Sequence, residues 1–181
     1  MGLFGDFFRK QEGLETTWWE NGQKRREGNY KNGKKEGLWI EWYDNGQKHY
    51  ERNYKNGKLD GFFTWWHENG QKECEKTYKN GRLGGPVTSW YKKGQKAGEG
   101  NYKNNKLDGF FTWWHENGQK KSEGHHKDGK KEGLETEWYE NGQKKEEGNY
   151  KRSSKEGLWV FWDKDGNVTK TEAYKNGERV R

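Results

Sequence analysis

A period of 24 residues runs through almost the whole chain and constrains its fold more than any other feature. Glycine recurs at one fixed place in seven consecutive rows, at Gly13, Gly37, Gly61, Gly85, Gly109, Gly133 and Gly157. Tryptophan recurs five residues later in every row, at Trp18, Trp42, Trp66, Trp90, Trp114, Trp138 and Trp162. Rows this short cannot each bury a core, so the period predicts an array in which every row stacks on its neighbours.

Each row has the pattern of a β-hairpin. Two runs of six to eight residues are separated by an Asn-Gly pair such as Asn21-Gly22 and closed by Lys-Asn-Gly, as at residues 31–33. Asn and Gly tolerate positive φ, so these pairs favour tight turns and leave no room for a helix. We therefore expect an all-β fold, an elongated single sheet of antiparallel hairpins. Residues 1–12 would form an N-terminal cap, and residues 13–181 the array of seven 24-residue repeats.

The turn chemistry also predicts a register within each hairpin. A three-residue loop at residues 20–22, with Gly22 as a bulged residue, pairs Trp18 with Lys24 and Leu14 with Gly28. One buried face of the sheet would then carry the regular apolar positions, since a buried face fixes strand register. That face would consist of Leu14, Thr16, Trp18, Arg26, Gly28 and Tyr30 and their equivalents. Gly28 would leave room for a neighbouring ring, and Lys24 would lie along a tryptophan.

Composition favours a core made of aromatic rings. The 181 residues include only eight Leu, four Val and one Ile, but twelve Trp, ten Tyr and eight Phe. Disordered chains are poor in aromatic residues, and each ring can bury about 150–250 Å². A shallow core of rings is therefore expected in place of an aliphatic one.

The charge and the termini exclude several classes of protein. A net charge of +7 comes from 36 basic and 29 acidic residues, so the surface is mixed, and nucleic-acid binding is not indicated. No apolar run is long enough to span a membrane, and the first ten residues are too short and polar for a signal peptide. The single cysteine, Cys74, cannot form an internal disulfide. Together these features predict a cytoplasmic protein.

Four short motifs of the rows resemble those of a known family. They are Trp42-Tyr43, Asn45-Gly46-Gln47-Lys48, Gly28-Asn29-Tyr30 and Lys55-Asn56-Gly57. The rows resemble the MORN-repeat variant of bacterial proteins of the YwqK type, which are often labelled antitoxin components. The resemblance covers residues 13–177, with departures at Pro86, Asn105, His126 and residues 153–154. It implies a twisted antiparallel sheet without a cofactor that binds proteins or, in some MORN arrays, membrane lipids. A toxin as partner is implied by the family label alone.

Nothing in the sequence indicates an enzyme, a cofactor or a metal site. The pairs His67-Glu68 and His115-Glu116 lack the second histidine of a zinc-protease motif, and both histidines stand where other rows have a ring. The adjacent pair His125-His126 supplies too few ligands for zinc. The glutamates that recur from Glu27 onward are expected to pair with Lys or Arg across strands. We therefore predict no catalytic, cofactor-binding or metal-binding residues.

The face opposite the regular positions is the predicted partner-binding surface, because its residues change from row to row. Three rows are strongly aromatic at places where two others are acidic or polar, and exposed aromatic patches mark interaction sites. The predicted partner-binding residues are Trp39, Phe63, Trp65, His67, Phe111, Trp113, His115, Trp159 and Phe161.

Several partners fit this surface on sequence evidence. The leading hypothesis is a non-enzymatic protein-interaction scaffold that is antitoxin-like or immunity-like. Self-association, in which the rings pack against the sheet itself or a second copy, stays open beside it. The alternative hypothesis is association with anionic lipid membranes through lysines and rings.

Overall fold

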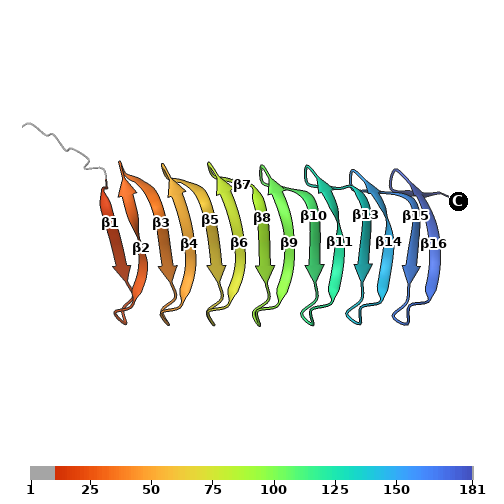
Figure 1. Cartoon of the computed structure of the whole chain (residues 1–181), viewed down its shortest axis with the longest axis horizontal. Coiled ribbons are helices and arrows are strands. Elements are labelled where there is room, and N and C mark those ends of the chain that lie inside the picture. The colour runs from red at the N-terminus through yellow and green to blue at the C-terminus, as the bar shows by residue number, and fades with distance from the viewer. Residues whose placement is uncertain (1–10, 181) are drawn as a thin grey trace, which may run out of the picture.

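The computed structural model describes residues 11–180, which form one antiparallel sheet of 17 strands and contain no helix. Each strand pairs with its neighbour in the chain, so seven hairpins stand side by side in a single layer (Figure 1). The all-β hairpin array expected from the period is therefore confirmed. The predicted N-terminal cap, by contrast, lies almost entirely outside the described residues.

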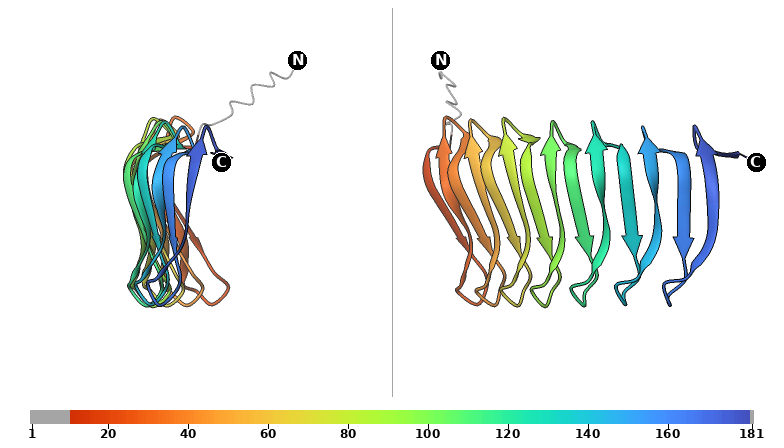
Figure 2. Two further views of the ribbon diagram at one scale, coloured as in Figure 1. Left: turned by 90° about the vertical axis from the view of Figure 1, so that its right-hand side faces the viewer. Right: turned by 45° about the vertical axis from the view of Figure 1, so that its right-hand side comes forward.

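The strands follow the rows closely. Their bounds are β1 Gly13–Trp18, β2 Lys24–Lys31, β3 Lys34–Trp42, β4 Lys48–Lys55, β5 Lys58–Trp66, β6 Lys72–Lys79, β7 Arg82–Leu83, β8 Gly85–Trp90, β9 Lys96–Lys103, β10 Lys106–Trp114, β11 Lys120–Lys127, β12 Lys130–Lys131, β13 Gly133–Trp138, β14 Lys144–Lys151, β15 Ser154–Trp162, β16 Val168–Lys175 and β17 Glu178–Val180. Two row strands are interrupted, at Gly84 between β7 and β8 and at Glu132 between β12 and β13. Seen along the long axis, the strands are bowed and the sheet twists gradually from row to row (Figure 2).

The hairpin loops, at the bottom of Figure 1, have the predicted three-residue geometry. Trp19 N donates to Gln23 O at 2.8 Å, and Gly22 N donates to Trp19 O at 3.0 Å. Gly22 has φ of 82°, a left-handed conformation that glycine adopts without steric cost. Trp18 stands opposite Lys24, as the loop predicts.

A bulge beyond this loop makes the rest of the predicted register wrong. Thr17 pairs with Arg26 directly after Trp18 pairs with Lys24, so Arg25 has no partner across the hairpin. Leu14 consequently pairs with Asn29 and not with Gly28. A bulge adds one residue to one strand, and side chains alternate between faces, so the extra residue inverts the remainder of the strand.

The bulge repeats in every hairpin and determines two chemically distinct faces. The variable face carries the positions of Glu15, Thr17, Arg26, Gly28 and Tyr30 at 24-residue steps. The regular face carries the positions of Leu14, Thr16, Trp18, Lys24 and Glu27 at the same steps. The prediction that Leu14 and Tyr30 share one buried face is therefore wrong. Tyr30 lies with the changing residues, and the leucine faces solvent.

Side chains at the hairpin loops hydrogen-bond each row to the next. Tyr43 Oη donates to Trp66 O at 2.8 Å, and Asn45 Nδ2 donates to Glu68 O at 3.0 Å. The same bonds recur at Tyr91 to Trp114 O (2.6 Å) and at Tyr139 to Trp162 O (2.9 Å). These bonds satisfy loop carbonyls that would otherwise depend on water, so the loops form a continuous ladder.

The last row lacks this connection. Asp163 replaces the aromatic residue, and its carboxylate accepts hydrogen bonds from Asp165 N at 3.0 Å and Asn167 N at 2.9 Å within its own loop. The Asp163 side chain therefore stabilises the loop in which it stands.

The turns between rows, at the top of Figure 1, are tight two-residue turns with positive φ at both positions. Asn32 and Gly33 have φ of 54° and 74°, as a type I′ turn requires. Asn105 and Ser153 take the glycine place with φ of 68° and 71°. Asn105 Oδ1 accepts a hydrogen bond from Leu83 N at 2.7 Å, so its side chain compensates for the unfavourable backbone.

Candidate functional site

Two tryptophans form the most buried parts of the variable face. Trp39 is 2% exposed and lies flat over Gly28 of the preceding row, where a Cβ atom would come within 2.2 Å of the ring. Its Nε1 donates to Asn29 O at 3.1 Å, and the Tyr30 ring meets it edge-on at 4.9 Å. Trp159, which is 1% exposed, repeats this arrangement five rows further along. These two rings are structural core.

Lysines cover the outer surfaces of the same two rings. Lys35 Nζ lies 4.2 Å from the Trp39 ring centroid, and Lys155 Nζ lies 3.8 Å from that of Trp159. Such contacts stabilise by about 0.5–1 kcal/mol at exposed sites and by more when they exclude water. A partner approaching the variable face therefore meets a lysine at these rows before it meets the ring.

A half-buried aromatic cluster occupies the variable face of β4 and β5. Tyr50 lies 5.3 Å from Trp65 and 5.9 Å from Phe63, measured between ring centroids. The Arg52 guanidinium lies 4.2 Å above the Tyr50 ring and 3.5 Å from the Glu41 carboxylate. This cluster, Glu41, Tyr50, Arg52, Phe63 and Trp65, combines rings with an anchored arginine, a combination typical of interface hot spots.

A second aromatic group lies two rows further along. Phe111 is 5% exposed and packs against Gly124 and the His126 ring, which is 4.9 Å away. Trp113 lies over Gly98 and keeps 40% of its surface exposed. Phe111 therefore belongs to the core, whereas Trp113 presents a ring to solvent.

The two predicted histidines lie at the hairpin loops, at the place where other rows have tyrosine. His115 Nε2 is 3.0 Å from Trp138 O, the counterpart of the tyrosine bond to the next row. His67 Nδ1 is instead 3.1 Å from the Glu73 carboxylate. His115 therefore makes the contact of the tyrosine that it replaces, whereas His67 pairs with a glutamate of the following strand, β6.

The structure thus divides the nine predicted partner-binding residues. Trp39, Phe111 and Trp159 are buried, and Trp113 is exposed. The remaining five are half-buried: Phe63, Trp65, His67, His115 and Phe161. Their role in binding stays a prediction, but only the half-buried and exposed members offer surface to a partner.

Sequence reasoning missed an exposed apolar column on the regular face. Its members are Leu14 (65% exposed), Leu38 (46%), Phe62 (70%), Phe110 (77%), Leu134 (55%) and Leu158 (61%). Pro86 takes this place in the fourth row. The residues opposite are uncharged or weakly basic, as in the pairs of Leu14 with Asn29 and Phe110 with His125. The Leu/Phe periodicity, interrupted at Pro86, was the available signal, but the predicted register assigns these positions to a buried face.

Beside this column, lysines and tryptophans alternate along the sheet. Lys24 Nζ lies 5.8 Å from the ring of Trp42 in the next row and 2.7 Å from Glu27 Oε2. The hydrogen bond from Lys24 is the main cause that lowers the pKa of the Glu27 carboxyl. The recurring glutamates do pair with lysine, but within one strand, so the predicted pairing across strands is wrong. The same contacts recur in the next five rows.

On the other side of the column, a basic edge follows the turns between rows. Lys31 pairs across the turn with Lys34, and the next four turns repeat the pair. The cations involved are Lys31, Lys34, Lys55, Lys58, Lys79, Arg82, Lys103, Lys106, Lys127 and Lys130. Within residues 11–180, none of them forms an ion pair.

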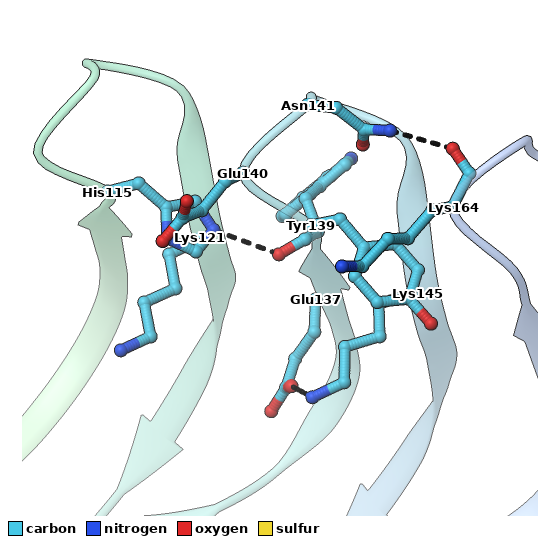
Figure 3. A pocket seen from close by; sticks show the side chains of 9 residues that line it. His115, Lys121, Glu137, Tyr139, Glu140, Asn141, Lys145 and Lys164 are labelled. Atoms are coloured by element: carbon cyan, nitrogen blue, oxygen red, sulfur yellow. Dashed lines mark hydrogen bonds and ion pairs between the residues drawn. The ribbon is translucent and has the colours of Figure 1, made fainter.

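A shallow hollow of about 480 Å³ opens between hairpin loops near β13 and β14 (Figure 3). Some of its polar groups have partners inside the protein. Lys145 Nζ lies 3.1 Å from Glu137 Oε2, and Asn141 Nδ2 donates to Lys164 O at 2.7 Å. His115 on the opposite side is held by the next row, as described above. Lys121 and Lys164 also line the hollow, and within residues 11–180 neither forms an ion pair. The hollow lies between successive hairpin loops, and we assign no ligand to it.

The residues that could carry chemistry are dispersed. His125 and His126 point to opposite faces, since one contacts Phe110 and the other Phe111. Burial raises the pKa of the Cys74 thiol, which opposes reactivity. Across residues 11–180 no three metal-ligating side chains lie together. The same stretch holds no helix of the length and apolarity needed to cross a membrane.

Comparison with known proteins gives one family. The family described as MORN repeat variant matches the chain seven times, at residues 11–32, 35–56, 59–80, 83–104, 107–128, 131–152 and 155–176. The matches recur every 24 residues and account for most of the chain, in agreement with the predicted number and period of the rows. A search of curated proteins found no match.

Proposed function

We propose, from the premise that this chain belongs to the MORN repeat variant family, that it is a non-enzymatic scaffold that binds a protein partner through the variable face. Repeats of this kind are generally protein- or membrane-binding modules. The observation that carries the proposal is the contrast between the two faces. The regular face carries similar residues in each row. The residues of the variable face differ from row to row, although the rows share one backbone structure.

The strongest part of that face is the cluster around Tyr50, Phe63 and Trp65, extended by the exposed Trp113. Half-buried rings bind a partner at low entropic cost because their neighbours already hold them in place. Arg52 is stacked on Tyr50 and paired with Glu41, so its guanidinium is held in position as well. We infer that a protein partner covers this region of β4 and β5 and extends toward β10.

Two aromatic residues on each of the strands β5 and β10 supply a matched test. Trp65 and Trp113 face the variable side, while Phe62 and Phe110, three residues earlier, face the regular side. The double variant Trp65→Ala/Trp113→Ala should lose capture of a protein from source lysate while its far-UV circular dichroism stays that of a β-sheet. The control Phe62→Ala/Phe110→Ala should retain capture. Loss of capture in the control alone would reject the variable face as the binding surface.

A second candidate function rests on the regular face. There the exposed apolar column lies beside the basic edge, and rings or leucines flanked by unpaired lysines favour an anionic membrane surface. Co-sedimentation with vesicles of phosphatidylcholine and phosphatidylserine tests this candidate. The Phe62→Ala/Phe110→Ala variant should then lose sedimentation and the Trp65→Ala/Trp113→Ala variant should keep it. Equal sedimentation with vesicles of pure phosphatidylcholine would exclude an electrostatic contribution to membrane binding.

The antitoxin-like or immunity-like role is a narrower version of the scaffold proposal. It requires that the captured protein be toxic to the source organism when produced alone. Co-production of the full chain should restore growth, and the Trp65→Ala/Trp113→Ala variant should not. A captured protein without toxicity would leave the scaffold proposal in place and remove the antitoxin role.

A further inference from the structure

A carboxylate binds the backbone of nearly every turn between rows. In each case the N–H of the first turn residue donates to a side chain twenty residues earlier. The bonds are Asn32 to Glu12 (2.6 Å), Asn56 to Glu36 (2.7 Å), Asn80 to Asp60 (3.0 Å), Asp128 to Asp108 (2.9 Å), Arg152 to Glu132 (3.0 Å) and Asn176 to Glu156 (2.8 Å). Six occurrences show that this N–H is built to bind a carboxylate oxygen, with the short distances of charge-assisted bonds.

One turn lacks its carboxylate. The equivalent donor is Asn104 N, and the residue twenty positions earlier is Gly84, which has no side chain. The turn itself is unchanged, since Asn104 has φ of 51° and Asn105 N donates to Leu83 O at 2.9 Å. Among the described residues, Asn104 N has no acceptor. The donor is therefore present in its usual geometry, and only the acceptor is missing.

The gap opens into a cleft of about 910 Å³ that is lined by four cations, Lys58, Lys79, Arg82 and Lys103. Its one carboxylate, on Asp60, is already engaged by Asn80 N. A second cleft at the turns near β12 has a similar basic lining, but there Glu132 fills the equivalent place. The protein thus contains a filled and an unfilled version of one arrangement.

We propose that the gap at Gly84 binds a carboxylate of a partner polypeptide, either an acidic side chain or a C-terminal carboxylate. The inference rests on the proposed scaffold function and names a chemical feature of its partner. A carboxylate is favoured over phosphate because the protein itself places one on this donor in six turns. Phosphate sites instead converge several N–H groups on one anion. The surrounding cations attract the ligand, and the turn N–H fixes its position.

The site can be closed without disturbing the backbone. Gly84 does not adopt positive φ, and a Cβ atom there would lie 3.8 Å from Tyr102 O, an ordinary contact. Gly84 N donates to Thr77 O at 2.9 Å, as Glu132 N donates to His125 O at 2.9 Å. Gly84→Glu should therefore copy the turn that contains Glu132 and place the protein's own carboxylate on Asn104. Gly84→Ala keeps the gap open and serves as its control.

The test uses the full chain labelled with ¹⁵N and follows the Asn104 amide resonance at low ionic strength. Four probes are added: an amidated peptide with one Glu, a neutral peptide with a free C-terminus, an amidated peptide with Gln in place of Glu, and inorganic phosphate. We expect saturable shifts of Asn104 with one or both carboxylate peptides and none with the Gln peptide. The peptide that binds identifies the source of the carboxylate.

The variants make the result specific to this turn. Gly84→Glu should abolish the saturable shift, Gly84→Ala should retain it, and Glu132→Gly should create a second responding amide at Arg152. Shifts that persist in Gly84→Glu, or saturation by phosphate alone, would overturn the proposal. Capture of the partner through Trp65 and Trp113 is measured separately, so failure of the carboxylate site is distinguishable from failure of the scaffold function.

Discussion

The substitution Gly28→Ala tests the packing of the variable face most directly. Gly28 does not adopt positive φ, so alanine fits the backbone, yet its Cβ would lie 2.2–2.5 Å from three atoms of Trp39. The ring is 2% exposed and hydrogen-bonded to Asn29 O, so it cannot tilt freely. The change therefore isolates a steric conflict between one methyl group and one buried ring.

The expected cost follows from that conflict. Overpacking a well-filled site costs about 1–3 kcal/mol, and alanine returns about 0.4–1 kcal/mol by restricting the unfolded chain. Complete expulsion of the ring would forfeit up to about 4–6 kcal/mol, from about 150–250 Å² at 25 cal/mol per Å². We expect a net loss of about 1–3 kcal/mol in the free energy of unfolding, because a tilted ring keeps part of its burial.

Urea unfolding followed by far-UV circular dichroism measures this loss, and hydrogen exchange in β2 and β3 locates it. Gly84→Ala is the matched control, since its methyl group meets no atom closer than 3.8 Å. In the double variant Gly28→Ala/Trp39→Val, the second change should recover at least about 1 kcal/mol as coupling energy. The chain itself combines a larger residue with valine at the equivalent places, Lys76 in the third row and Val87 in the fourth. Equal losses in Gly28→Ala and Gly84→Ala, with no coupling, would refute the packing argument.

Three further predictions concern the loops and the buried charge. Tyr43→Phe removes the bond to Trp66 O and should lower the free energy of unfolding by about 0.5–1.5 kcal/mol in urea titrations. Asp163→Phe should lower it through loss of the hydrogen bonds that Asp165 N and Asn167 N donate to the carboxylate within that loop. Burial raises the pKa of Glu135, although Lys131 Nζ lies 2.5 Å from it. The folded state therefore holds this proton more tightly than the unfolded state, and stability falls as pH rises through the folded pKa. The urea midpoint of Glu135→Gln should rise relative to that of the unchanged protein as the pH increases from 4 to 8. Midpoints of the two proteins that change in parallel over this range would contradict a raised pKa of Glu135.

Local chemistry made the array predictable. Asn-Gly pairs select tight turns by their own φ preferences, and a strict period without insertions forces every row to repeat its neighbour. For that reason the hairpins, the three-residue loop at Gly22 and the fit of Gly28 to a neighbouring ring are all evident from the sequence. The row-to-row bonds, such as Tyr43 to Trp66 O, follow once those rows are stacked.

The assignment of side chains to faces was not determined by local chemistry. It depends on the bulge at Arg25, a place where the rows carry residues as different as His49, Ala97 and Thr169, so no composition marks it. The bulge is evident only in the pairing of the assembled hairpin, and one extra residue reverses every later side chain. The sequence by itself determined a seven-row β-hairpin array. Only the tertiary structure decided that Trp39 is core, that Phe62 is exposed and that Asn104 lacks the carboxylate its neighbours have.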